Sequence, residues 1–100
     1  MFNRDEVAKY IYQTSPYYKR LQNNESTRYW RITGILNDIA EYFKVTKEEM
    51  YKFLKQYPDY FHCQYYHWGE QWTAAITLTE MLYEKFTGKK FVSYFDEHTF

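Results

Sequence analysis

The spacing of apolar residues predicts two helices in the first part of the chain. Over residues 4–13 apolar side chains recur at intervals of three and four, and Asn3 with Glu6 forms a capping box ahead of them. Residues 14–16 stop this helix and start a second, shorter one that runs through Leu21. A polar loop follows it.

Two more helices with a very short connection are predicted in the middle of the chain. Residues 34–43 place their large apolar side chains on one helical face and their acidic side chains on the other. The next helix, residues 46–57, begins at once with a capping box of Thr46 and Glu49, and Pro58 closes it. Helices joined so tightly must cross, which is the helix-turn-helix arrangement.

The stretch from residue 61 to 79 has apolar residues at every second position in both of its halves, which predicts a β-hairpin. Pairing Phe61 with Ile76 aligns the two apolar faces. The same register places Trp68-Gly69 at the tip, where glycine adopts a positive φ most easily.

The remaining segments add a short strand, a last helix and an aromatic tail. Residues 27–33 are aromatic and β-branched, which favours a short strand or an extended segment. Residues 77–88 are predicted to form a helix that Gly88 ends, and residues 89–100 are an aromatic tail suited to a final strand or a dimer contact. Residues 1–100 are therefore expected to form one domain of the α+β class.

Composition adds a high aromatic content and an uneven charge. Aromatic residues make up 24% of the chain, and tyrosine, with 13 copies, combines a large flat surface with a polar tip. Thirteen basic and 13 acidic residues give a net charge of zero, which argues against an indiscriminate polyanion binder. Residues 17–31 nevertheless hold a basic, aromatic patch with Glu25 as its one acidic residue. The basic residues of this patch are Lys19, Arg20, Arg28 and Arg31.

The hairpin contains potential metal ligands, but their arrangement does not predict a metal site. His62 and Cys63 point to opposite faces of a strand, and the chain has no second cysteine to join them and His67. The same geometry argues against a Cys-His nucleophile, and the paired carboxylates are sequence neighbours that point apart on helices. No glycine-rich phosphate-binding motif is present. We therefore expect no metal, no cofactor and no enzyme activity.

Features of the termini and of the apolar runs predict a cytoplasmic protein. The N-terminal residues have no apolar h-region and no small-residue cleavage site, and no apolar run approaches the ~18 residues of a membrane span. A lone Cys63 excludes an internal disulfide. The bias toward Lys, Tyr, Phe, Ile and Asn suits an AT-rich genome, such as that of a low-GC bacterium, its plasmid or its phage.

The predicted order of elements resembles the winged helix-turn-helix domain. The likeness is carried by ILNDIAEYFKVTKEEMYKFLKQYPDYF (35–61) for the helix pair and WTAAITLTEMLYEKF (72–86) for a wing strand running into a helix. It covers about residues 5–87 and implies a three-helix core, a two-stranded wing hairpin and a C-terminal helix. In that superfamily the second helix of the pair lies in the DNA major groove, and the wing reaches an adjacent minor groove.

This resemblance implies a DNA-binding surface built from three groups of residues. The recognition helix, 46–57, offers Lys47, Tyr51, Lys52 and Lys55 on its outward side. The wing tip offers Tyr66, His67, Trp68 and Gln71. The basic patch holds the DNA backbone, with Arg28 and Arg31 on a strand beside the wing. Because the recognition helix lacks Arg, Asn and Ser and starts with Glu48 and Glu49, we expect most contacts from the wing and the basic patch.

The implied function is sequence- or shape-specific binding of double-stranded DNA by a homodimer that forms through the N-terminal helix or the aromatic tail. Roles that fit are a transcriptional regulator or an accessory factor for plasmid transfer or partition. The alternative is a small phage or plasmid protein that uses a winged-helix frame to bind and inhibit a host protein. The neutral charge, the abundant tyrosine and the glutamates of the recognition helix favour this alternative. Trp68, expected to be exposed at the hairpin tip, is a candidate contact with a partner.

Overall fold

The computed structural model describes residues 2–98, and these form a small α+β domain with six helices and three strands. Residues 99 and 100, the end of the predicted aromatic tail, lie outside the described residues. The helices are α1 (Arg4–Thr14), α2 (Pro16–Gln22), α3 (Leu36–Tyr42), α4 (Lys47–Leu54), α5 (Glu80–Thr87) and α6 (Tyr94–His98). The strands are β1 (Thr33–Ile35), β2 (Phe61–Trp68) and β3 (Gln71–Leu78).

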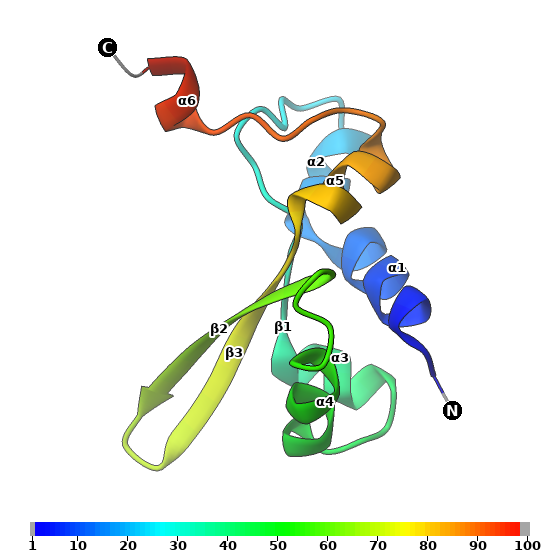
Figure 1. The fold of residues 1–100 in the computed structure, drawn as a ribbon, viewed down its shortest axis with the longest axis vertical. Coiled ribbons are helices and arrows are strands. Elements are labelled where there is room, and N and C mark those ends of the chain that lie inside the picture. Colours follow the sequence, from blue (N-terminus) through cyan, green and yellow to red (C-terminus); the bar gives the residue numbers. More distant parts are fainter. Residues whose placement is uncertain (1, 99–100) are drawn as a thin grey trace.

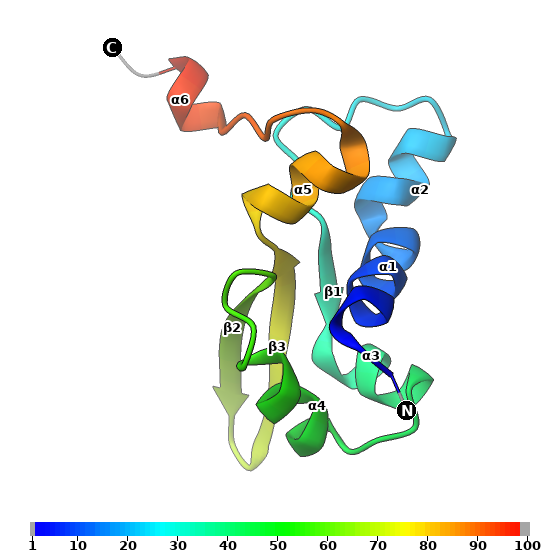
Figure 2. The ribbon, with the colours of Figure 1, turned by 45° about the vertical axis from the view of Figure 1, so that its right-hand side comes forward.

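The strands form one antiparallel sheet in the order β1-β3-β2, and helices α1, α3 and α4 pack on one side of it (Figures 1 and 2). The face of β3 that they cover carries the buried side chains of Ala74, Ile76 and Leu78. The alternate residues of β3 lie on the other face. The β2–β3 hairpin extends beyond the body at one end of the sheet, while α2 and α5 lie at the other end (Figure 1).

One cluster of buried apolar side chains joins the helices to the sheet. The cluster takes residues from α1 to α5 and from the two hairpin strands, so that residues far apart in sequence share one core. Its completely or almost completely buried members include Val7, Ile11, Ile32, Leu36, Ile39, Met50, Leu54, Ile76, Leu78 and Leu82. Burying each such side chain contributes about 1.5–3 kcal/mol, so this cluster is the main source of stability.

The two predicted helix caps are confirmed. Asn3 Oδ1 accepts a hydrogen bond from the Glu6 N–H at 2.9 Å at the start of α1. Thr46 Oγ1 accepts one from the Glu49 N–H at 3.1 Å at the start of α4. These bonds satisfy backbone donors that a helix N-terminus leaves without an intrahelical partner.

The tight turn between α3 and α4 is a Schellman motif centred on Lys44. The Lys44 N–H donates to the Glu41 C=O, and the Val45 N–H donates to the Ala40 C=O, both at 3.1 Å. Lys44 has a φ of 58°, in the left-handed region that glycine adopts without a Cβ penalty.

Replacing Lys44 by glycine should therefore raise the free energy of unfolding by about 0.5–1 kcal/mol, measured by urea denaturation. A matched control is Lys9→Gly, in the right-handed interior of α1, which should lower it by about 1 kcal/mol. Equal destabilisation by both changes would contradict a left-handed Lys44.

The strand predicted at residues 27–33 is wrong over most of its length. Residues 27–30 form a turn, in which the Trp30 N–H donates to the Thr27 C=O at 3.0 Å and Tyr29 has a φ of 69°. The observed strand β1 starts only at Thr33. The aromatic residues of this segment pack around the turn, and their β propensity is overridden by these local and tertiary contacts.

The start and end of the two central helices also differ from the prediction. β1 takes the first residues of the predicted helix 34–43, because Gly34 lets the strand approach α1 and α3 closely. A Cβ at Gly34 would lie 3.4 Å from Ile11 and 3.5 Å from Ile39. The predicted helix 46–57 ends early, and the residues before Pro58 form a tighter turn, since proline disfavours helical geometry at the residue before it.

The predicted hairpin is confirmed, but its predicted register is wrong by two residues. Phe61 pairs with Leu78 instead of Ile76, and the two-residue loop is Gly69-Glu70. Gly69 has a φ of 59° at the first loop position, where a type II′ turn requires glycine. Because the shift is an even number of residues, every apolar residue keeps its predicted face, and the alternation alone does not select the register.

The C-terminal segments follow the prediction in part. The predicted helix 77–88 corresponds to α5, although its first residues belong to β3 and to the cap at Thr79, and Gly88 ends it in a left-handed conformation. Within the aromatic tail, residues 94–98 form the short helix α6 instead of a final strand, and α6 stands away from the body (Figures 1 and 2). No helix in residues 2–98 has the length and apolar character needed to cross a lipid bilayer.

Candidate nucleic-acid interface

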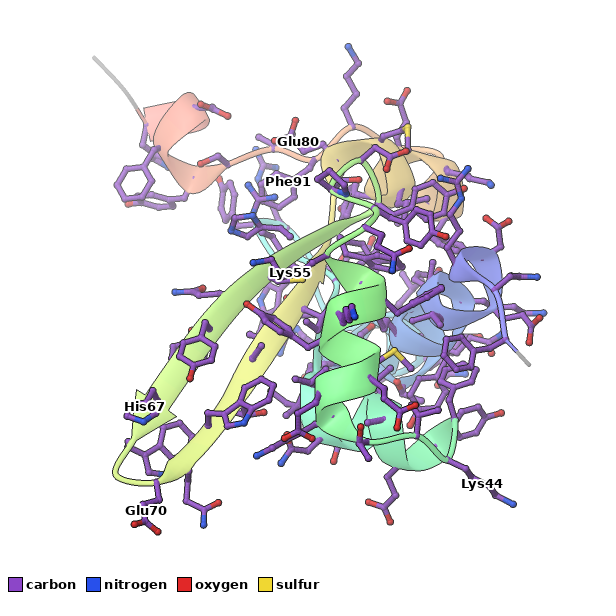
Figure 3. The ribbon with its side chains drawn as sticks, turned by 60° about the horizontal axis from the view of Figure 1, so that its bottom comes forward. Lys44, Lys55, His67, Glu70, Glu80 and Phe91 are labelled. Atoms are coloured by element: carbon purple, nitrogen blue, oxygen red, sulfur yellow. The ribbon has the colours of Figure 1, made fainter. Side chains whose placement is uncertain are left out.

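Helix α4 lies against the β2–β3 hairpin, and aromatic side chains from both elements meet between them (Figure 3). The ring centroid of Tyr51 in α4 is 5.4 Å from that of Trp72 in β3 and 6.3 Å from that of Tyr65 in β2. Tyr65 in turn stacks on Trp72 at 5.5 Å and on His67 at 6.3 Å. We call Tyr51, Tyr65, His67 and Trp72 the aromatic cluster.

Two lysines of the α4 segment lie over rings of the aromatic cluster. Lys47 Nζ donates a hydrogen bond to the Trp72 C=O at 2.8 Å and lies 4.8 Å from the centroid of the Trp72 ring. Lys55 Nζ lies 5.4 Å from the centroid of the Tyr51 ring. Figure 3 places Lys55 where the end of α4 meets the hairpin. Cations over aromatic faces are held by about 0.5–1 kcal/mol at exposed sites, so these ammonium groups are partly fixed at this surface.

The prediction that Lys47 and Tyr51 point outward from the helix is wrong. Both side chains are half-buried against the hairpin, whereas Lys52 and Lys55 are exposed. Helical periodicity identifies the side opposite the core, but it does not reveal that a hairpin distant in sequence covers part of that side. Glu48 and Glu49 are exposed at the start of α4, so its solvent-facing side carries both signs of charge.

The predicted wing-tip residues divide between the two faces of the hairpin. His67 pairs with Trp72 and belongs to the face that carries the aromatic cluster. Tyr66, Trp68 and Gln71 lie on the opposite face, since successive side chains of a strand alternate. Trp68 is 59% exposed, which is unusual for tryptophan in water.

The basic patch lies at the opposite end of the sheet from the hairpin tip. Arg31 pairs with Glu80 at 3.9 Å, and its guanidinium lies 4.0 Å from the centroid of the Phe91 ring. Figure 3 shows Glu80 and Phe91 far from Glu70, which marks the hairpin loop. The predicted position of the patch arginines on a strand beside the wing is therefore wrong, because the segment that precedes β1 forms a turn and a loop.

The other two arginines of the patch are also engaged within their own segment. Arg20 forms an ion pair with Glu25 at 3.8 Å, donates to the Ser26 C=O at 2.8 Å and lies 4.3 Å from the centroid of the Trp30 ring. Arg28 donates to the Tyr29 hydroxyl at 3.1 Å. Lys19 is exposed on α2. The patch is thus separate from the surface of α4 and the hairpin.

Two members of the aromatic cluster, Tyr65 and Trp72, were not among the predicted DNA-binding residues. The alternation puts both on the apolar face of the hairpin, which suggests core residues. Tyr65 is 51% exposed, however, and it lies on β2, the edge strand of the sheet.

The thiol of Cys63 provides a chemical probe of this arrangement. Burial raises the pKa of Cys63, and the nearby Lys55 ammonium acts in the opposite direction. A thiolate reacts with iodoacetamide and a thiol does not. The pH midpoint of alkylation should therefore lie above that of the urea-unfolded chain.

Lys55→Ala should move the pH midpoint of Cys63 alkylation still higher, because it removes the cation that stabilises the thiolate. The control Lys85→Ala, on α5, should leave the midpoint in place. A midpoint that does not respond to Lys55→Ala would contradict the placement of Lys55 beside the hairpin.

Metal-binding side chains do not gather at this surface. His62 and Cys63 lie on opposite faces of β2, and among the side chains that the structure describes no group of three or more His, Cys, Asp or Glu is arranged to hold a metal ion.

No protein-family model matches the chain, and no curated protein or solved structure is significantly similar to it. A functional proposal therefore rests on the geometry of α4 and the hairpin.

Proposed function

We propose that the protein binds double-stranded DNA through α4 and the β2–β3 hairpin. The observation that carries the proposal is the row of cations and aromatic rings along this surface, with Lys47 and Lys55 over the rings of Trp72 and Tyr51. Lysines supply phosphate contacts, and aromatic and polar residues on a hairpin suit contact with sugars and groove edges.

The order of elements supports the same proposal. A short strand precedes the helix pair, α3 and α4 are joined by the Lys44 turn, and the hairpin follows α4. β1 pairs with β3, the second strand of the hairpin, so the hairpin is fixed to the helical core at its base and extends at its tip. This order resembles that of a winged helix-turn-helix, and in our proposal α4 is the recognition helix and the hairpin is the wing.

In the proposed complex the exposed Lys52 and Lys55 contact phosphates, while Lys47 keeps the hairpin beside α4 through its bond to the Trp72 C=O. The hairpin tip, with Trp68 and Gln71, enters the adjacent minor groove, where apolar and polar side chains respond to groove width and A·T content. A protein of zero net charge depends on such local cations for affinity. The basic patch lies at the opposite end of the sheet from the hairpin tip and is not part of the proposed contact.

The role that we propose for this duplex binding is that of a transcriptional regulator or of an accessory factor in plasmid transfer or partition. Selection of the purified protein against a randomised duplex library at about 50 mM salt tests the proposal. We expect enrichment of a defined motif, rich in A·T pairs where the wing binds. Retention no greater than that of beads without protein would overturn it.

Exposure of Trp68 favours a second candidate function, the binding of a host protein through the hairpin tip. Such a complex would be weakened by Trp68→Ala and would depend little on salt, because its interface is aromatic. The DNA complex would instead weaken steeply with salt. The salt dependence of binding therefore distinguishes the two functions.

A further inference from the structure

Strand β2 is an edge strand of the sheet and lacks the features that usually protect such an edge. The sheet order β1-β3-β2 leaves one side of β2 without a neighbour. The eight residues of β2, FHCQYYHW, include no proline and no Lys, Arg, Asp or Glu, which natural edge strands use to prevent pairing. In Figures 1 and 2 no helix or strand of the described chain lies along the outer edge of β2 near the hairpin tip.

The hairpin register determines which backbone groups of β2 point outward. Trp68 and Gln71 flank a two-residue loop and form a hydrogen-bonded pair, as the ends of a β-turn do. Because hydrogen-bonded pairs alternate along an antiparallel ladder, the N–H and C=O groups of Cys63, Tyr65 and His67 point away from β3. Backbone groups of this kind need a partner, from water or from another strand.

The chemistry of β2 fits pairing with a second copy of itself. An antiparallel pair of identical strands places each residue opposite one from the same segment, so any charged residue would risk repulsion. β2 has no charged residue, and Tyr65 is the middle one of the three residues, Cys63, Tyr65 and His67, whose backbone groups point outward. A twofold axis at Tyr65 brings the outward-pointing backbone groups of the two strands into register.

We infer that two copies of this chain associate through the outer edges of their β2 strands, in an antiparallel register centred on Tyr65. In this register Cys63 faces the partner's His67, and Gln64 faces the partner's Tyr66. The six strands then form one continuous sheet with a twofold axis perpendicular to it. The inference is independent of DNA binding.

The symmetry has a structural consequence for the helices. An axis perpendicular to the sheet keeps each face of the sheet on the same side, so both α4 helices lie on one face of the dimer. This arrangement differs from a dimer formed through the N-terminal helix or the aromatic tail. A dimer of this kind presents two copies of the aromatic cluster in one direction.

Two paired variants test the interface by analytical ultracentrifugation of the full chain. Gln64→Lys with Tyr66→Lys places lysines opposite lysines across the axis, and dimerisation should weaken about tenfold or more. Gln64→Glu with Tyr66→Lys places unlike charges opposite each other. The dissociation constant of this dimer should return to that of the native chain or fall below it. Both variants carry the same loss of Tyr66, so only the sign of the charge at residue 64 differs.

The inference is overturned if the native chain stays monomeric up to about 100 μM, where a weak interface would still form. It is also overturned if the dimer persists in the lysine pair, or if the glutamate-lysine pair fails to restore it. Circular dichroism of both variants shows that the hairpin remains folded. Since no DNA is present, these results leave the proposed DNA binding unaffected.

Disulfide crosslinking tests the same register without the lysine variant, in case that variant does not fold. In His67→Cys, the new thiol faces the partner's Cys63, whereas within one chain the two positions are four residues apart along a strand, roughly 13 Å, too far for a disulfide. Mild oxidation should convert most of this variant to a covalent dimer. The control Gln71→Cys, on β3, should remain largely uncrosslinked, and equal crosslinking of both variants would overturn the register.

Discussion

Leu54→Ala should lower the free energy of unfolding by about 2–5 kcal/mol, a large part of the ~5–15 kcal/mol that stabilises a domain of this size. Leu54 ends α4 and is completely buried in the cluster that joins α4 to the sheet. Removing its side chain loses the transfer free energy of the buried atoms and leaves a cavity. Because α4 is held against the hairpin partly through this residue, we expect the aromatic cluster to loosen as well.

The loss in free energy of unfolding is measured by urea denaturation, with tryptophan fluorescence as the signal. The matched control is Leu21→Ala, since Leu21 is also helical but 45% exposed, and that change should cost well under half as much. Similar costs for the two substitutions would contradict the position of Leu54 in the core.

Lys52→Ala combined with Lys55→Ala should weaken binding to the selected duplex roughly tenfold at low salt and lower the slope of log K against log salt by about two. Each lysine that contacts a phosphate releases about one condensed counterion, so losing both removes two. The measurement is fluorescence anisotropy over a salt series with the same duplex.

The control for the α4 lysines is Lys85→Ala with Lys89→Ala, at and just after α5, which removes the same charge from another part of the molecule. It should leave the slope almost unchanged. A third variant, Arg28→Ala with Arg31→Ala, examines the basic patch, and we expect it to resemble the control because the patch lies at the far end of the sheet. A slope that falls only in this arginine variant would move the interface to the basic patch.

Local sequence patterns predict most of the helices and strands of this chain. The caps at Asn3 and Thr46 and the glycine at residue 88 mark helix ends because they act on backbone groups within a few residues. The two faces of the hairpin follow from alternation for the same reason. Such features need no knowledge of the rest of the chain.

Features that depend on distant residues were predicted less well. Gly34 belongs to a strand because Ile11 and Ile39 pack against it, and the helical pattern of its own neighbours gives no sign of that contact. The orientation of Tyr51 depends on a hairpin that follows it in sequence. Arg31 is turned toward α5 and the aromatic tail for a similar reason. The residues of the candidate site could therefore be identified only from the tertiary structure.

The pairing of β1 with β3 has a consequence for how the chain folds. Thr33 and Thr77 share a hydrogen bond of 3.0 Å between hydroxyl groups that are 44 residues apart in sequence. Closing so long a loop costs chain entropy before any contact is gained, whereas the hairpin and the α3–α4 turn form from near neighbours. We expect the helix pair and hairpin to form early and the docking of β1 to limit the folding rate. The N-terminal third of the chain would then be the last part to become ordered.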